Sequence, residues 1–120
     1  MRDSERTKFA QLASPQERVA ALNDRLRMRG QGGRLLVTRG VMALPNFSTA
    51  ELLDALAAFD RFDEANDPYG ERDFGDVELC GHTLLWKIEY YDNQLACASP
   101  DPSDPLVTTR VLTVMLEGEY

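Results

Sequence analysis

The strongest constraint on the fold of this chain is a change in hydrophobic period near residue 77. Before that point, two segments have apolar residues at helical spacing. Val77 and Leu79 then alternate with polar residues, and a second alternating run spans residues 84–90 after the break at Gly81-His82. Period-two alternation is typical of strands with one buried face, and a short break between two such runs predicts a hairpin. The chain therefore combines helices with antiparallel strands.

Two capping boxes predict where helices begin. In residues 14–17 (SPQE) and again in 48–51 (STAE), a serine precedes a glutamate by three residues. At this spacing both side chains can bond free backbone N–H groups at a helix start. These signals predict helices at 15–29, ended by Gly30, and at 49–61. Between them, residues 34–38 have the apolar, β-branched character of a short buried strand.

The segment 105–117 carries two conflicting signals. Asp104 and Pro105 have the order of an N-cap followed by proline in the first turn, which favours a helix. The valines and threonines of the segment favour a strand. We favour the helix because the cap signal is local and specific. We also expect a short strand through Leu95 and Cys97, after a tight turn at 92–93.

These elements predict an α+β domain of two layers, an antiparallel sheet of three to four strands with three helices packed mainly on one face. Residues 14–120 form this single domain, and the polar, aperiodic residues 1–13 precede it as a tail. Trp86 is expected in the core. Lys87, Glu89 and Tyr91 are expected on the opposite face, which is either exposed or used by a homodimer.

Length and composition restrict the compartment and the chemistry. A chain of 120 residues has room for one core, and no stretch approaches the roughly 18 apolar residues of a membrane helix. The first residues lack the apolar part of a secretory signal, so we expect a cytoplasmic protein without membrane contact. Cys80 and Cys97 are then expected to be buried, reduced thiols.

Charge is distributed unevenly along the chain. The net charge is −7, made up of +5 in residues 1–39 and −12 in residues 40–120. Such an acidic chain repels nucleic acid over most of its surface, so direct nucleic-acid binding is not expected.

The densest charge lies between Asp60 and Asp76, where seven acidic residues outnumber Arg61 and Arg72 for a local net charge of −5. Carboxylates beside aromatic residues on a rigid frame attract a basic protein and can stand in for a row of phosphates. We therefore expect an interaction or regulatory module that binds a basic protein or protein complex, with a nucleic-acid-mimicking inhibitor as one form of it. The predicted partner-binding residues are Asp63, Glu64, Asp67, Tyr69, Glu71, Asp73, Phe74, Asp76, Glu89, Tyr91 and Asp92.

The arginines of the first third form a second, weaker site prediction. They cluster where the first helix ends and the first strand begins, so they could converge as an anion-binding patch. The alternative is that they pair with the acidic half of the chain or of a second copy. These residues are Arg25, Arg27, Arg29, Arg34 and Arg39.

Other functions stay open. The acidic stretch is also compatible with a solvated loop or a metal site, although an EF-hand starting at Asp63 would place Pro68 where glycine is needed. A carboxylate-based or metal-dependent enzyme would use Asp67, Glu71, Asp73, His82 and Glu89. A self-associating structural subunit is a third interpretation. No nucleophile, base and orienting group stand at a recognisable spacing, so we assign no catalytic residue, cofactor or metal ligand.

Several separated motifs resemble one family. They are DPYGERDFG at 67–75, WKIEYYD at 86–92, SPDP at 99–102 and TRVLT at 109–113. In this order they resemble a family of small bacterial proteins known as a domain of unknown function, over roughly residues 16–120. The resemblance implies a self-contained domain and supplies no activity or site residue.

Overall fold

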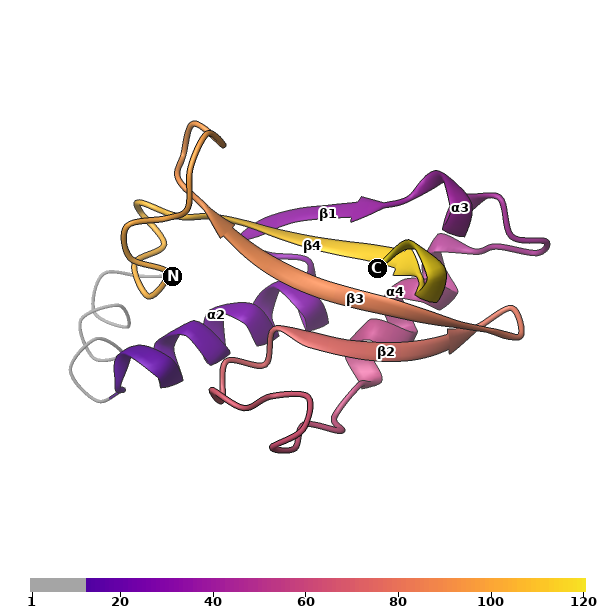
Figure 1. Ribbon diagram of the computed structural model, residues 1–120, viewed down its shortest axis with the longest axis horizontal. Helices are drawn as coiled ribbons and strands as arrows, with labels where there is room; N and C mark the ends of the chain where they lie inside the picture. The colour runs from indigo at the N-terminus through magenta and orange to yellow at the C-terminus, as the bar shows by residue number, and fades with distance from the viewer. Residues whose placement is uncertain (1–12) are drawn as a thin grey trace.

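A four-stranded sheet in the order β1-β4-β3-β2 forms the frame of the protein. The computed structural model describes residues 13–120; most of the predicted tail lies outside this range. Figure 1 shows the helices α2 and α4 on one side of the sheet. The elements are α2 (Pro15–Arg29), β1 (Gly33–Val37), α3 (Arg39–Met42), α4 (Thr49–Ala58), β2 (Phe74–Leu79), β3 (His82–Tyr91), β4 (Thr109–Leu116) and the 3-10 helix η1 (Glu117–Glu119).

The predicted fold class is confirmed: the described residues form three helices and an open sheet of four strands, with the helices packed on the sheet. β3 pairs antiparallel with both β2 and β4. The sheet differs from the prediction in one respect, because β1 pairs parallel with β4 and makes the sheet mixed. None of the described helices is long and apolar enough to cross a bilayer.

Both predicted caps are present. The Ser14 hydroxyl accepts the backbone N–H of Glu17 (3.1 Å), and the Ser48 hydroxyl accepts that of Glu51 (3.3 Å). Gly30 ends α2 in the left-handed conformation, at φ 66°. The second predicted helix, α4, ends at Ala58 instead of residue 61, because the backbone becomes extended at Phe59. A buried arginine of α2 donates to the carbonyl groups of Leu56 and Phe59 at this end.

The predicted helix at 105–117 is wrong, because this segment contains β4. The Asp104 carboxylate accepts the N–H of Leu106 (2.9 Å), so the capping signal forms a local turn instead of a helix start. β4 lies between β1 and β3 and is buried on both faces, with Val111 and Met115 on one and Leu112 and Val114 on the other. Burial between two neighbouring strands therefore makes this segment a strand, despite the helix-capping signal before it.

The predicted strand through Leu95 and Cys97 is also wrong. Only Ala98 forms an isolated bridge, with Tyr91, and the preceding residues turn around the Asp92 carboxylate. Cys97 is exposed, contrary to the expectation of two buried thiols, and Cys80 is half-buried in the hairpin. The backbone N–H groups of Gln94 and Ala96 donate to the Asp92 carboxylate instead of to a neighbouring strand.

The core lies between the helices and the sheet. Trp86 is fully buried, as predicted, and the Phe59 ring meets it edge-on at 5.4 Å. Leu52 and Leu56 bring α4 onto the same cluster. Because neighbouring residues of a strand point to opposite faces, β2 and β3 also carry a row of side chains that points away from the helices. This row contains Phe74, Asp76, Lys87, Glu89 and Tyr91.

Candidate functional site

A buried polar network fixes the start of β2 against α2. Asn23 of α2 is fully buried, and its amide nitrogen donates to the Tyr90 hydroxyl (2.7 Å) and to the Glu71 carbonyl (3.0 Å). The Tyr90 hydroxyl donates in turn to the Glu71 carboxylate (2.8 Å). Burial raises the pKa of Tyr90, so the hydroxyl keeps its proton for this bond. The network holds the end of the acidic segment in one position.

Arg110 extends the network to β4. Its Nε donates to the side-chain oxygen of Asn23 (2.9 Å), and a terminal nitrogen donates to the carbonyl of Pro102. The guanidinium carbon lies 5.2 Å from the centre of the Tyr90 ring. Burial lowers the pKa of Arg110, while Tyr90 and Glu71 act in the opposite direction. Arg110 therefore holds the 99–105 loop to the body of the protein.

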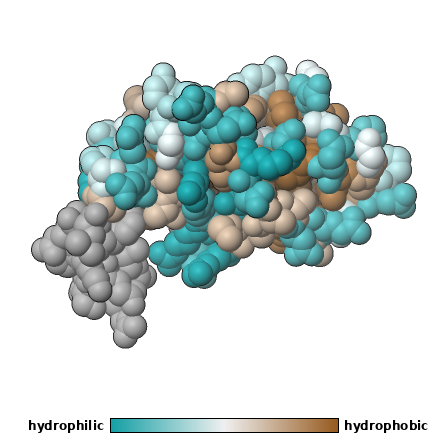
Figure 2. Space-filling view, turned by 90° about the horizontal axis from the view of Figure 1, so that it is seen from below, coloured by the Kyte–Doolittle hydropathy of each residue, from teal (hydrophilic) through white to brown (hydrophobic). Residues whose placement is uncertain are grey.

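Many carboxylates of the acidic segment are bound to local groups. Asp63 accepts two backbone N–H groups of its own turn (2.9 and 3.0 Å), and Asp67 accepts the backbone N–H of Arg72 (2.9 Å). Asp76 pairs with Arg61 (2.8 Å). Figure 2 shows hydrophilic residues across the middle of the face that points down in Figure 1, where this segment lies. With Glu71, which accepts the Tyr90 hydroxyl, four of the seven acidic residues of the segment are engaged in this way.

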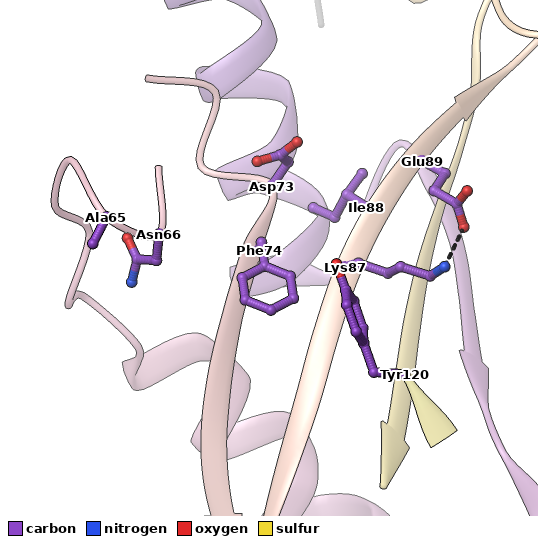
Figure 3. Close-up of a pocket in the computed structure, with 8 residues that line it drawn as sticks. All are labelled: Ala65, Asn66, Asp73, Phe74, Lys87, Ile88, Glu89 and Tyr120. Carbon is purple, nitrogen blue, oxygen red and sulfur yellow. Dashed lines mark ion pairs between the residues drawn. The ribbon is translucent and has the colours of Figure 1, made fainter. Parts of the chain in front are cut away.

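One pocket lies beside β2 and β3, with a volume of about 480 Å³. Asp73 lies just before β2, and Figure 3 shows Asn66 on the loop to the left of Phe74. The Phe74 and Tyr120 rings meet edge to face at 5.6 Å, and Lys87 pairs with Glu89 at 3.2 Å. We call this the Asp73 pocket; it is lined by Ala65, Asn66, Asp73, Phe74, Lys87, Ile88, Glu89 and Tyr120.

Asp73 is a partly buried acidic residue of the pocket. Partial burial raises the pKa of its carboxyl group, and the nearby charges of Glu71 and Asp67 raise it further. Within residues 13–120 the ion pairs do not include Asp73. A cation beside such a carboxylate favours its charged form, because the attraction offsets the cost of desolvation and reduces the repulsion from the neighbouring carboxylates.

The pocket gathers only part of the predicted partner site. Asp73, Phe74 and Glu89 line it. Tyr91 lies in a separate groove, and Asp92 accepts backbone N–H groups of its turn (3.2 and 2.9 Å). The other six predicted residues lie in the loop before β2 and on β2 itself: Asp63, Glu64, Asp67, Tyr69, Glu71 and Asp76.

Sequence reasoning missed Asn66 and Tyr120 as pocket residues. The alternation of β3 places Lys87 on this face of the sheet but assigns it no part in the site. Asn66 lies in the turn, where its amide nitrogen donates to the Arg61 carbonyl (2.7 Å). No sequence pattern brings Tyr120 to Phe74, since their contact depends on how η1 folds back over the sheet.

The five arginines of the weaker prediction separate into two groups. Arg27 is buried and donates to two carbonyl oxygens at the end of α4 (2.7 and 2.8 Å), so it cannot belong to an anion patch. Arg25 is half-buried and bonds a glutamine of the following turn (3.0 Å). Arg29, Arg34 and Arg39 are exposed, and the ion pairs of residues 13–120 do not include them. The arginines therefore do not neutralise the acidic segment within one copy.

The residues of the enzyme alternative do not form one site. In the β2–β3 ladder, His82 is five positions from Lys87, which pairs with Phe74 beside Asp73. At about 3.3 Å per residue this places His82 on the order of 16 Å from the pocket. Among the described residues, no group of three or more His, Cys, Asp or Glu side chains is arranged to hold a metal ion.

Comparison with known proteins gives one match. Residues 37–119 match a family described as "Protein of unknown function (DUF3768)". This range runs from the end of β1 to η1 and includes every residue of the Asp73 pocket except Tyr120. Neither a curated protein nor a solved structure matches the chain.

Proposed function

Because the chain belongs to the DUF3768 family, whose description assigns no function, we propose from the geometry of the site that it is a non-enzymatic interaction module for a basic protein partner. The observation that carries this proposal is the Asp73 pocket. It combines two aromatic rings with a partly buried carboxylate that forms no ion pair within residues 13–120. We infer that the pocket receives one arginine or lysine side chain of the partner.

The chemistry of the pocket suits a guanidinium group. Asp73 supplies the countercharge, and the rings of Phe74 and Tyr120 offer surfaces on which a planar cation can stack. The protein already uses this contact internally, since Arg61 lies 5.3 Å from the centre of the Phe59 ring. The Lys87–Glu89 pair is partly exposed and stands at the far side of the opening, so Lys87 is paired with Glu89 and not with Asp73.

A single anchored cation has better support than imitation of a nucleic-acid backbone. A phosphate-like row requires several free carboxylates, whereas Asp63 and Asp67 bind backbone groups and Asp76 binds Arg61. These side chains still contribute to the negative field around the pocket. That field speeds the approach of a basic partner, and salt weakens it.

A pair of charge-matched variants tests the proposal. Asp73→Asn and Asp54→Asn each remove one negative charge, and Asp54 is an exposed residue of α4 away from the pocket. The first probe is N-acetylarginine amide, titrated against the labelled protein by NMR with N-acetylcitrulline amide as the uncharged control. We expect the arginine derivative to shift the amide signals of Asn66, Asp73 and Phe74. Asp73→Asn should abolish these shifts and Asp54→Asn should preserve them.

The same variants then test the partner. A protein captured from native cells should bind Asp73→Asn at least about tenfold more weakly than Asp54→Asn, because loss of a charged contact costs about 1.5–3 kcal/mol. Affinity should also fall as salt increases. Equal losses in the two variants, or an affinity that does not change with ionic strength, would contradict the proposal. Displacement of the partner from nucleic acid would instead favour mimicry.

A further inference from the structure

β1 is an edge strand with an open side. It pairs with β4 alone in the sheet order, and Figure 1 shows it along the border of the sheet. Four of its five residues are exposed, including Leu35 at 37% and Leu36 at 53%. The other edge strand, β2, carries acidic residues on its outer face. β1 contains no proline, and Arg34 is its one charged residue.

The register of β1 shows which of its backbone groups bond no other group among residues 13–120. The N–H of Thr38 donates to the carbonyl of Val114 in β4 (3.1 Å). Because successive N–H groups of a strand point to opposite sides, those of Leu36 and Arg34 also face β4. The N–H and C=O groups of Gly33, Leu35 and Val37 therefore point away from the sheet. They form a template for one more strand.

Beside this edge lies a groove of about 330 Å³ on the face opposite the helices. Its walls are mainly apolar, with Arg34 as the charged member. Arg34 and Leu36 are two positions apart on one face of β1, so an added strand meets a cation and an apolar surface at a spacing of two residues. The groove is lined by Arg34, Leu36, Tyr91, Leu95, Val111 and Thr113.

We propose that β1 binds an extended acidic segment of a partner protein, which adds to the sheet as a fifth strand. The segment places a carboxylate opposite Arg34 and an apolar side chain, two residues away, in the groove. Arg29 and Arg39 flank the strand, are exposed, and attract further acidic residues of the segment. This surface is separate from the Asp73 pocket, which lies beside the strands at the other edge.

Charge complementarity favours an acidic strand over a second copy of this chain. Antiparallel pairing of two β1 strands centred on Leu35 places Arg34 opposite Leu36, where it finds no carboxylate. Such pairing also brings two sets of exposed arginines to one interface, where like charges repel. An acidic segment instead meets these arginines with countercharge.

A peptide titration tests the proposal. The probe is the seven-residue peptide TETVTET, in which glutamate, valine and glutamate share one face in either direction of pairing. Its control is TKTVTKT. In NMR titrations at millimolar peptide, we expect TETVTET to shift the amide signals of Leu35 and Val37, the free donors of the edge. The lysine peptide should leave these signals in place.

Two variants distinguish strand addition from simple charge attraction. Leu35→Pro removes an outward N–H without removing a bond to β4, a substitution that edge strands tolerate, and it should abolish binding while a melting curve confirms the fold. Arg34→Glu should reverse the preference toward TKTVTKT, since Arg34 is exposed and its charge faces the peptide.

Three results would overturn the proposal: unchanged β1 signals at millimolar TETVTET, equal binding of the two peptides, or undiminished binding by folded Leu35→Pro. A dimer in sedimentation that Leu35→Pro dissociates would assign the edge to a second copy instead. Asp73→Asn should not affect any of these titrations. Failure of the strand-addition proposal can therefore be distinguished from failure of the basic-partner proposal.

Discussion

Replacing Tyr90 by phenylalanine removes one oxygen atom from the network that holds the acidic segment. That oxygen donates to the Glu71 carboxylate (2.8 Å) and accepts from the Asn23 amide (2.7 Å). A bond to a charged group contributes about 1.5–3 kcal/mol and a neutral one about 0.5–1.5. Tyr90 is only partly buried, so water can replace some of the loss, and we take the low end of the sum. The expected destabilisation is about 2 kcal/mol.

Chemical and thermal unfolding measure this loss. For a chain of this length, about 2 kcal/mol lowers the melting temperature by roughly 8 °C. The control is Tyr91→Phe, the neighbouring residue on the opposite face of β3, whose hydroxyl makes no hydrogen bond with the described residues. Tyr91→Phe should change stability by less than about 0.5 kcal/mol. Equal effects of the two substitutions would refute the network argument.

The pH dependence of the same pair checks the cause. Burial raises the pKa of Tyr90 above its ordinary value of 10.0, so the folded state resists ionisation of the hydroxyl. A raised pKa gives stability that is complete below the unfolded-state pKa and is lost as pH rises through the folded-state value. The difference between the wild type and Tyr90→Phe should therefore be constant near neutral pH and shrink above about pH 10. A stability difference between the wild type and Tyr90→Phe that grows with pH would contradict the raised pKa of Tyr90 as the cause.

Two further substitutions test the packing and the charge of the site. Gly75→Ala places a methyl group 2.6 Å from the Phe59 ring and 2.8 Å from the Trp86 ring. It should lower the free energy of unfolding in urea by about 1–3 kcal/mol. Gly118→Ala is the control, because its methyl group meets nothing within 4 Å. Asp73→Asn should stabilise the protein by less than about 1 kcal/mol at neutral pH, because the raised pKa of Asp73 means that its charge opposes folding. That gain should vanish below about pH 4, where the wild-type carboxyl is protonated, and a gain independent of pH would disprove the charge explanation.

The parts of the fold that were predictable are those encoded by local chemistry. Ser14 and Ser48 cap their helices as their spacing to a glutamate indicates, and the alternation through Trp86 gives both the strand and its buried face. These signals act within a few residues, where the sequence fixes their geometry.

β4 was missed because its environment is not local. The cap at Asp104 is real but closes only a turn, and no nearby residue shows that the following segment lies between two strands. Burial on both faces then favours the β-branched residues of a central strand. Arg110, in the middle of this strand, is tolerated in the core because Asn23 and the Pro102 carbonyl accept its donors.

The site was predictable only as a region. Composition identifies the acidic stretch, but it does not show which carboxylates are already bound. Asp63 and Asp67 are engaged by backbone N–H groups, whereas Asp73 lines a pocket with the Phe74 ring of β2 and the Tyr120 ring that follows η1. This distinction depends on turn geometry and on contacts between distant segments.

The buried network has a consequence for how the two proposed surfaces relate. Asn23, Arg110, Tyr90 and Glu71 come from α2, β4, β3 and the loop before β2, so one set of hydrogen bonds crosses from the middle of the sheet to the edge that carries the Asp73 pocket. β1, at the other edge, is held directly by β4. Both surfaces are thus attached to one rigid frame, on opposite edges and with opposite charge. On these two proposals, a basic partner at one edge would not compete for the groups that would bind an acidic strand at the other.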